Sequence, residues 1–277
     1  MLIHDFLKNS AKKFPDKNAV IHQKSSLTYK QLDDYSDSFA GILADNNVTK
    51  GERVVLFLDN SCDYLAAYFG ISKAGAVITA LNSQLVPREL SVILSDCSPK
   101  VIITDKKHSK VAEEALVSCV NPASLLFIEK GYLCSSSFDQ CSSLNHQCLS
   151  DNDLAMIIYT SGTTGKPKGA MLSHENITAN ADSIIEYLHL TSDDKVMVVL
   201  PFFYSYGNSL LTTHIKAGGT LVIDNRFMYP NVVLENMIKE EVTGFAGVSS
   251  HFNILIKKSA ISKYSFPKLR YVTQAGG

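Results

Sequence analysis

The stretch IIYTSGTTGKPKG, residues 157–169, contains the features that decide the fold and the function of this chain. It begins with apolar residues that predict a buried strand and continues with hydroxyl side chains, glycines and two lysines, Lys166 and Lys168. Glycines let the backbone turn tightly and approach a ligand closely, and the free N–H groups of such a turn attract anions. Hydroxyl donors and a lysine charge also suit phosphate. The stretch therefore predicts a polyphosphate-binding loop that follows a strand.

Two other interpretations of this stretch are open. A kinase or NTPase P-loop has the pattern G-x-x-x-x-G-K-[ST], in which the residue after the lysine supplies a hydroxyl for Mg²⁺. Here Pro167 follows Gly165-Lys166, so that hydroxyl is absent. A flexible surface loop is the simpler alternative, because Gly, Ser and Thr also cluster in turns. The buried strand before the loop and the two lysines within it favour phosphate binding.

The composition is typical of a globular protein, with 277 residues, 45% hydrophobic, 19% charged, and a net charge of −1. This near-neutral balance argues against nucleic acid or an anionic membrane as partner, because both favour basic surfaces. No apolar run approaches the roughly 18 residues of a membrane span, and the start lacks the apolar core of a signal peptide. The six cysteines form no C-x-x-C pair, which favours reduced thiols over a zinc site. We expect a cytoplasmic protein with no membrane partner.

Short apolar runs alternate with amphipathic stretches along the rest of the chain, which predicts strands alternating with helices. Such alternation implies mostly parallel sheets covered by helices on both faces, the doubly wound α/β class. Thr28 with Gln31, and Ser173, have the side chains and positions of helix N-caps. Residues 130–152 lose the pattern and predict a surface connection. The expected strands lie at 19–21, 54–58, 76–80, 101–104, 124–128, 154–160, 170–172, 195–200, 220–223, 243–246 and 270–273, and the expected helices at 2–14, after 28, at 61–73, from 87, and at 109–119, 173–188, 208–217, 230–240 and 250–259.

The full string YTSGTTGKPKG, residues 159–169, resembles the phosphate-binding signature of the adenylate-forming enzymes. This family comprises acyl-CoA synthetases, adenylation domains of peptide synthetases, and luciferases. The resemblance extends over essentially the whole chain, which is similar to the front part of a family member. The other stretches that carry it are the opening segment 28–82, LSHEN at 172–176, LPFFY at 200–204, GVSSHF at 247–252, and QAGG at 274–277, the start of an adenine-binding loop.

The resemblance implies two doubly wound α/β subdomains of an adenylate-forming N-terminal domain. Residues of about 51–190 would form the first subdomain, ending in the phosphate loop and its helix. Residues 1–50 with 191–277 would form an incomplete second one, so that 1–277 is a partial AMP-binding domain. The family's later parts do not occur: the Thr-Glu motif whose acid holds Mg²⁺, the ribose-binding aspartate, and the lid domain with its lysine. We expect an N-terminal fragment; a naturally short, catalytically inactive nucleotide-binding or partner-regulated module is the alternative.

The activity that the resemblance implies is that of an ATP-dependent, AMP-forming carboxylic acid–thiol ligase. A carboxylate attacks the α-phosphate of Mg·ATP, giving an acyl-adenylate and pyrophosphate, and CoA or the phosphopantetheine of a carrier protein then displaces AMP. Attack of one anion on another requires the pyrophosphate charge to be neutralised and held in line. ATP, Mg²⁺, a small carboxylic acid, and CoA or an acyl-carrier protein are therefore expected, and the fragment alone is expected to be inactive.

The site residues are also carried over from the resemblance. The ATP-binding set is Thr160, Ser161, Gly162, Thr163, Thr164, Gly165, Lys168, Ala275, Gly276 and Gly277. The catalytic set is Lys168, which supplies the principal charge, with Thr164 and Tyr204. The substrate-binding set is Tyr204, Tyr206, Gly247, Ser250 and His251. Lys166 is given less weight, and no residue is assigned to a metal ion.

Tyr204 stands where many acyl-CoA ligases carry a histidine, in a P-L-F-H motif. The resemblance implies that it walls the acyl pocket near the reacting carboxylate; packing in an aromatic core is the alternative. Amino-acid-activating relatives present an aspartate near this position, and none occurs between Pro201 and Thr213. This absence favours a carboxylic acid without an α-ammonium group. His174, at a helix start, is interpreted as structural rather than catalytic.

Overall fold

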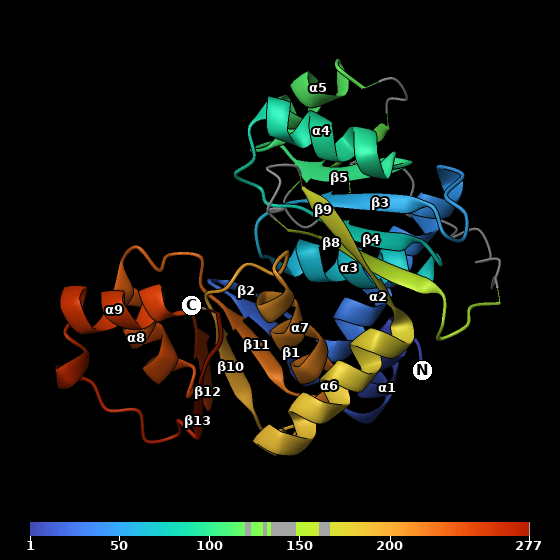
Figure 1. The fold of residues 1–277 in the computed structure, drawn as a ribbon. Coiled ribbons are helices and arrows are strands. Elements are labelled where there is room, and N and C mark those ends of the chain that lie inside the picture. The colour runs from blue at the N-terminus through green and yellow to red at the C-terminus, as the bar shows by residue number, and fades with distance from the viewer. Residues whose placement is uncertain (120–122, 130–131, 134–147, 161–166, 277) are drawn as a thin grey trace. The chain divides into compact units, whose positions relative to one another are not determined.

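The computed structural model describes residues 1–119, 123–129, 132–133, 148–160 and 167–276. Strands alternate with helices and pair into two sheets, each of which is mostly parallel (Figure 1). The mixed α/β class and the doubly wound arrangement are therefore confirmed. The chain divides into two compact units: unit 1 contains Met1–Asp5 and Leu32–Thr178, and unit 2 contains Phe6–Gln31 and Ala179–Gly277.

Unit 1 is built around a seven-stranded sheet. Its strands are β3 (Arg53–Phe57), β4 (Val77–Ala80), β5 (Val101–Asp105), β6 (Ser124–Glu129), β7 (Tyr132–Leu133), β8 (Leu154–Thr160) and β9 (Lys168–Ser173). Its helices are α3 (Cys62–Lys73), α4 (Pro87–Cys97), α5 (Ser109–Leu116) and most of α2 (Tyr29–Asp45). The strand order is β7-β6-β5-β3-β4-β8-β9, and only the edge strands β7 and β9 run antiparallel to their neighbours.

Helices cover both faces of this sheet. Val55 and Ile102 pack with buried residues of α4 and α5 on one face, and α3 and α2 lie on the other face. A Cβ at position 70 of α3 would lie 2.4 Å from the Cβ of Phe39 in α2, so these helices approach closely because residue 70 is glycine. The buried strands between the two helical layers explain why their sequences are continuously apolar.

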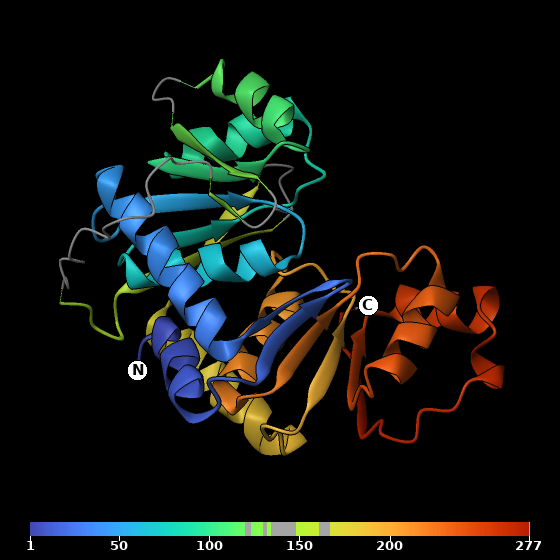
Figure 2. The same cartoon turned by 180° about the vertical axis from the view of Figure 1, so that it is seen from behind.

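Unit 2 is built around a six-stranded sheet. Its strands are β1 (Asn18–His22), β2 (Ser25–Thr28), β10 (Lys195–Val198), β11 (Thr220–Ile223), β12 (Gly244–Gly247) and β13 (Tyr271–Gln274). Its helices are α7 (Ser205–Ala217), α8 (Pro230–Lys239), α9 (Ser249–Lys258), and most of α1 (Ile3–Lys13) and α6 (His174–Leu188). The strand order is β13-β12-β10-β11-β1-β2, with only the β1–β2 pair antiparallel (Figure 2).

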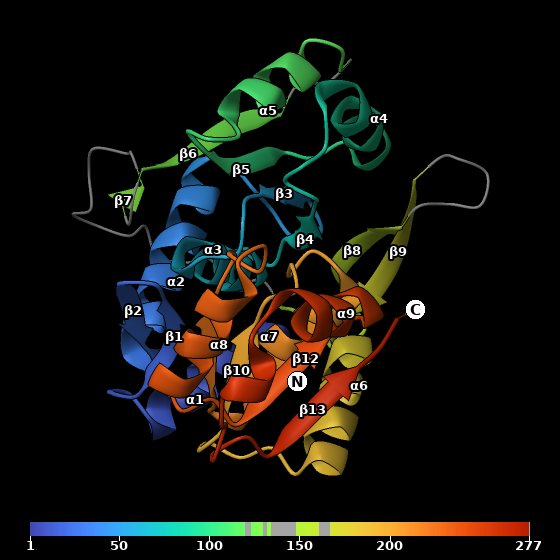
Figure 3. The ribbon, with the colours of Figure 1, turned by 90° about the vertical axis from the view of Figure 1, so that its left-hand side faces the viewer.

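The two faces of the unit 2 sheet are covered differently. Met197 and Phe245 point to one face, where they pack with buried residues of α8 and α9. Figure 3 shows these two helices beside the sheet. Side chains alternate along a strand, so Gly244 and Ala246 point to the opposite face, which α7 covers. On this face β12 has only small residues, and the ring of Tyr271 from β13 occupies the space beside Gly244.

Each strand and helix expected from the sequence is present, with ends shifted by a few residues. Strands β2 and β7 were not expected, because each is short and lies at a sheet edge where no apolar alternation is required. The expected surface connection at 130–152 falls largely outside the described residues. No helix in the described ranges is long and apolar enough to span a bilayer.

The unit boundaries differ from the expected ones near residues 50 and 190. Residues 32–50 belong to unit 1, because α2 packs against α3 at Gly70. Residues 179–190 belong to unit 2, where Asp182 of α6 forms an ion pair of 2.5 Å with Lys216 of α7. Sequence alternation locates the elements, but these helix contacts decide which sheet each helix joins.

The helix starts expected at Thr28 and Ser173 are confirmed. The Thr28 N–H donates to Oε1 of Gln31 at 2.9 Å, and the Gln31 N–H donates to Oγ1 of Thr28 at 3.2 Å. Ser173 and Asn176 exchange the same pair of bonds at 3.0 and 3.2 Å. These reciprocal bonds satisfy N–H groups that a helix start leaves without intrahelical partners.

Candidate functional site

The phosphate-loop stretch lies on the hairpin of β8 and β9 in unit 1. Thr160 at the end of β8 pairs with Lys168 at the start of β9, and the Thr160 hydroxyl donates to the Lys168 carbonyl at 3.5 Å. The Lys168 side chain is exposed, and no described residue pairs with its ammonium. The expected ATP-binding residues between these strands lie outside the described residues; they are Ser161, Gly162, Thr163, Thr164 and Gly165, with Lys166 beside them.

Close packing fixes the base of this hairpin. A Cβ at Gly169 would lie 2.8 Å from Cγ2 of Ile157, so a larger residue would push β9 away from β8. The Tyr159 phenol donates a hydrogen bond of 2.5 Å to Oδ2 of Asp96 on α4. Burial and this bond raise the pKa of Tyr159, which keeps the phenol protonated as a donor. The carboxyl end of β8 is therefore tied to α4.

In unit 2 the expected site residues lie at the carboxyl edge of the sheet. Strands β10, β11, β12 and β13 are parallel, so their carboxyl ends share one edge. The chain moves from β10 to β11 on one side and then to β12 on the other side of β10. Open α/β sheets bind ligands outside the carboxyl ends of their strands at such a switch point. The segments after β10 and β12 flank this position.

Tyr204 lies in the turn between β10 and α7. It is 52% exposed, and its ring contacts Phe203 with 4.2 Å between centroids. An aromatic core does not account for a side chain this exposed. The turn itself requires Gly207, because a Cβ there would lie 2.0 Å from the carbonyl oxygen of Pro201. The role of Tyr204 as a wall of the acyl pocket remains a prediction.

Tyr206 is half-buried in the first turn of α7. Its phenol shares a hydrogen bond of 2.7 Å with Oγ1 of Thr273 on β13, and burial raises the pKa of Tyr206. The polar end of Tyr206 is thus bound to the protein, and only its ring remains available to line a substrate pocket. No motif in the sequence marks Thr273 as a partner of Tyr206.

Gly247, Ser250 and His251 lie where β12 passes into α9. Gly247 is buried at the end of the strand, and a Cβ there would lie 3.2 Å from the Cβ of His251. Ser250 is exposed. The Nδ1 atom of His251 accepts the Val248 N–H at 3.3 Å, and its ring meets Phe227 edge-on at 4.5 Å. Burial lowers the pKa of His251, so the ring is a neutral cap of α9.

Ala275 and Gly276 are exposed at the exit of β13, and Gly277 lies outside the described residues. Gly276 has φ of 76°, which favours glycine, and a Cβ there would meet only Val248, at 3.7 Å. The side-chain amide of Gln274 donates to Oγ of Ser249 at 2.9 Å. The exposed backbone at Gly276 is therefore open to close approach by a flat ligand.

Two further observations concern residues outside these segments. His174 is buried in unit 1, and its Nδ1 accepts the Ile3 N–H at 3.1 Å. Burial and the neighbouring His4 lower the pKa of His174 to about 4, which agrees with the structural interpretation. Among the described residues no group of three or more His, Cys, Asp or Glu side chains is arranged to hold a metal ion. No residue is therefore assigned to Mg²⁺.

Comparison with known proteins places these features in a family. The feruloyl-CoA synthase of Amycolatopsis sp is 32% identical over 247 residues, which are 88% of this chain and 48% of that protein. The oxalate–CoA ligase of Arabidopsis thaliana is 30% identical over 282 residues, 96% of this chain and 54% of that protein. The crystal structure of the N-terminal domain of FACL13 from Mycobacterium tuberculosis matches with a TM-score of 0.88 at 26% identity, covering 100% of this chain and 70% of that one.

The fold and the hairpin motif define a nucleotide-binding α/β protein of the adenylate-forming type. The model of the AMP-binding enzyme family matches residues 7–277, and the chain belongs to this family. It corresponds to the N-terminal portion of the adenylate-forming enzymes, as the sequence resemblance implied. The chain spans about half the length of the curated relatives it matches.

Proposed function

We propose that this chain is the nucleotide-binding part of an ATP-dependent, AMP-forming ligase that joins a carboxylic acid to a thiol. The observation that carries the proposal is the hairpin of β8 and β9, which presents Thr160 and an exposed Lys168 on either side of the SGTTGK stretch. Similarity to two CoA ligases supports the same reaction class. The complete enzyme would use CoA, or the phosphopantetheine of a carrier protein, as the acceptor.

The residues of the hairpin would act on the phosphates of ATP. The carboxylate attacks the α-phosphorus, the bond to the bridging oxygen of pyrophosphate breaks, and the electron pair leaves with pyrophosphate. Lys168, with the hydroxyls of Thr160 and Thr164, would stabilise this departing charge. Mg²⁺ enters with ATP as part of the substrate. Because Gly169 and Tyr159 fix the base of the hairpin, the backbone at Lys168 would be in place before the reaction begins.

The residues at the carboxyl edge of unit 2 would bind the acid and the base of the nucleotide. The exposed ring of Tyr204 is suited to line the acyl pocket, with the ring of Tyr206 beside it in sequence. The exposed backbone of Ala275 and Gly276 would contact adenine. No aspartate lies between Pro201 and Thr213, so the preferred substrate is an acid without an α-ammonium group.

A panel of acids tests this function. We would measure acid-dependent exchange between ATP and labelled pyrophosphate with hydroxycinnamates, oxalate, fatty acids and α-amino acids. The complete ligase should catalyse exchange with an acid that lacks an α-amino group. Absence of exchange with every acid would overturn the ligase function, and a preference for amino acids would overturn the substrate class.

The 277-residue chain by itself provides a second test. We propose that it binds ATP weakly and forms no acyl-adenylate, because it covers about half of the relatives. Isothermal titration calorimetry measures the binding, and the same exchange assay measures the chemistry. Acid-dependent exchange by the 277 residues alone would show that they form a competent enzyme.

A further inference from the structure

Strand β13 is the outermost strand of the unit 2 sheet within the part of the chain that the structure describes, and it pairs there with β12. Its side chains alternate between the two faces: Tyr271 and Thr273 point to the face covered by α7, and Gln274 points to the face of α9. The strand leads directly into Ala275 and Gly276, where the adenine contact is proposed. The position of that backbone therefore depends on what holds β13.

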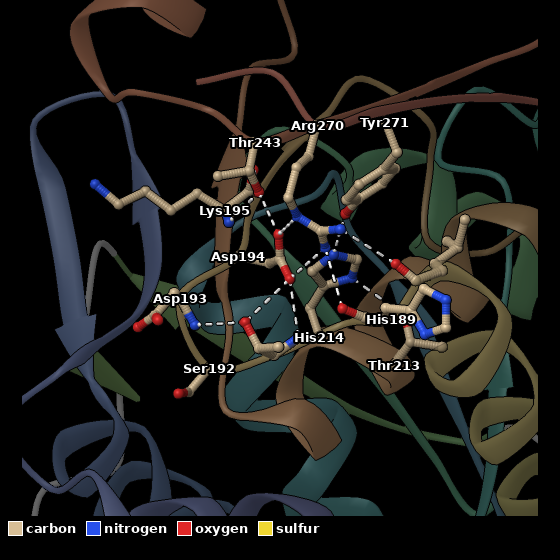
Figure 4. A network of polar contacts seen from close by, with 12 residues as sticks. His189, Ser192, Asp193, Asp194, Lys195, Thr213, His214, Thr243, Arg270 and Tyr271 are labelled. Atoms are coloured by element: carbon tan, nitrogen blue, oxygen red, sulfur yellow. Dashed lines mark hydrogen bonds and ion pairs between the residues drawn. The ribbon is translucent and has the colours of Figure 1, made fainter. Parts of the chain in front are cut away.

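The amino end of β13 is held by several contacts (Figure 4). Arg270 binds Asp194 through two nitrogens, at 3.0 and 2.8 Å. The Tyr271 ring crosses β12 where residue 244 is glycine, since a Cβ there would lie 2.1 Å from its Cζ. The Tyr271 phenol then donates to Nε2 of His214 at 2.7 Å. Loss of any one of these contacts leaves the others in place.

Among the described residues, the carboxyl end of β13 is held to neighbouring elements by one side-chain contact on each face. On the face of α7 the Tyr206 phenol and the Thr273 hydroxyl share one hydrogen bond of 2.7 Å. On the face of α9 the Gln274 amide donates to Ser249 at 2.9 Å. Tyr206 lies two residues after Tyr204, and Thr273 lies two residues before Ala275. The Tyr206–Thr273 bond therefore joins the turn of the acid subsite to the loop of the nucleotide subsite.

We propose that Tyr206 and Thr273 are positioning residues, whose shared hydrogen bond sets the distance between the turn at Tyr204 and the backbone of residues 274–276. This inference rests on the proposed function. Each hydroxyl acts through the backbone next to it, so neither needs to touch the nucleotide. Without the bond, β13 keeps its ladder with β12 and its anchored amino end, but its exit can move away from α7.

Two isosteric variants test the contact: Tyr206→Phe and Thr273→Val, each of which removes one hydroxyl and keeps the shape of the side chain. We expect each to raise the KM for ATP in pyrophosphate exchange by about fivefold, the usual scale for one hydrogen bond, with little change in Tm. The double variant should be no worse than either single variant, because both remove the same bond. Thr273→Ser keeps the hydroxyl and should therefore have the wild-type KM for ATP. Calorimetry on the 277-residue chain should show a parallel loss of ATP affinity.

Tyr271→Phe is the matched control, because it removes a hydroxyl from the same face of the same strand at the anchored end. It should lower Tm and leave the KM for ATP unchanged. Three outcomes would each overturn the positioning role. They are additive effects of Tyr206→Phe and Thr273→Val on the KM for ATP, a wild-type KM in Thr273→Val, and an equal rise of the KM in Tyr271→Phe. If the wild-type ligase shows no acid-dependent exchange, the proposed function is wrong. The ATP affinity of the 277-residue chain then tests the positioning role by itself: weaker ATP binding by Thr273→Val supports the role, and unchanged binding overturns it.

Discussion

Within each of the two sheets, whose strands are mostly parallel, the amino and carboxyl edges are built from different kinds of side chain. At the amino edge, an arginine at the start of a strand binds the last carbonyls of a helix in each unit. Arg53 donates to Cys97 and Ser98 at 2.7 Å in unit 1, and Arg270 donates to Leu188 and His189 at 3.4 and 3.2 Å in unit 2. These contacts satisfy carbonyls that a helix end leaves without partners.

The carboxyl edges carry exposed groups in addition to such contacts. Lys168, Tyr204, Ser250 and Gly276 are all exposed there, and glycines hold the tight turns. The amino edge fixes each sheet to its helices, and the carboxyl edge leaves donors, rings and bare backbone exposed. We therefore expect stability to depend mainly on the first edge and ligand binding on the second. Changes at the amino edge should therefore lower stability, and changes at the carboxyl edge should lower function.

The largest expected effect on stability is at Asp194. Its carboxylate is 2% exposed and accepts bonds from Arg270, from Oγ1 of Thr243 at 2.7 Å and from the N–H of Thr191 at 2.8 Å. Asp194→Ala should lower the free energy of unfolding by about 3 kcal/mol, because it removes a buried carboxylate that pairs with a half-exposed arginine and leaves the Thr191 and Thr243 donors without this acceptor. Urea unfolding followed by circular dichroism measures the loss. Asp193→Ala, at an exposed neighbour, is the control, and equal stability of the two variants would contradict the assigned role of the amino edge.

The largest expected effect on function is at Lys168. In the complete ligase, Lys168→Ala should remove at least about 2 kcal/mol of transition-state stabilisation, because it deletes a preorganised charge beside the pyrophosphate. Single-turnover formation of the acyl-adenylate measures this effect, and Tm should not change because the side chain is exposed. Lys110→Ala, which removes a lysine that is 86% exposed on α5, should leave the rate as it was. Unchanged adenylation in Lys168→Ala would exclude the residue from catalysis.

Low pH should lower the free energy of unfolding of unit 2, because the buried His214 becomes protonated. Its Nδ1 donates to the Leu210 carbonyl at 3.0 Å, and burial lowers its pKa from 6.5 to about 4. Between these values the unfolded chain binds a proton that the folded chain does not, so stability is complete above pH 6.5 and is lost as the pH falls toward 4. At pH 5 the loss from this residue is about 2 kcal/mol.

Unfolding at a series of pH values tests this prediction, and His174, with a pKa of about 4, should add a similar slope from unit 1. The variant His214→Asn should be less stable at neutral pH but should lose less stability between pH 6.5 and 4. A wild-type slope in this variant would show that the acid sensitivity arises elsewhere.

The smallest expected effect is at the Tyr204 phenol. Tyr204→Phe keeps the ring and removes one hydroxyl, so the KM for the acid should rise by an amount equivalent to about 1 kcal/mol or less. The KM for ATP and the Tm should stay unchanged, because the side chain is 52% exposed and follows the carboxyl end of β10. Steady-state exchange with the preferred acid measures both constants. A change in the KM for ATP alone would show that Tyr204 does not belong to the acid subsite.

The elements of the fold could be predicted because their signals are local. The apolar run of β8 and the reciprocal bonds of Thr28 with Gln31 depend on neighbours within a few residues. The start of α7 was expected three residues too late, at about 208 instead of Ser205. Glycine at 207 disfavours a helix by propensity, but the approach of the Pro201 carbonyl leaves no room for any other residue there.

The contacts that connect the site could not be predicted in this way. Tyr206 and Thr273 are 67 residues apart, and Arg270 and Asp194 are 76 apart. No spacing in the sequence marks such pairs. They arise because β13 is placed beside β12, where Gly244 lets the ring of Tyr271 pass over toward α7.

The class of fold, the helix caps and the phosphate-loop motif can be predicted from the sequence alone, because each depends on short-range periodicity or on a contiguous set of residue types. Only the three-dimensional packing shows which unit α2 and α6 join, which residues anchor the amino edge, and that the Tyr206 phenol is bound to Thr273. Those features depend on packing between elements distant in the chain, where shape and the need to pair buried polar groups select the partners.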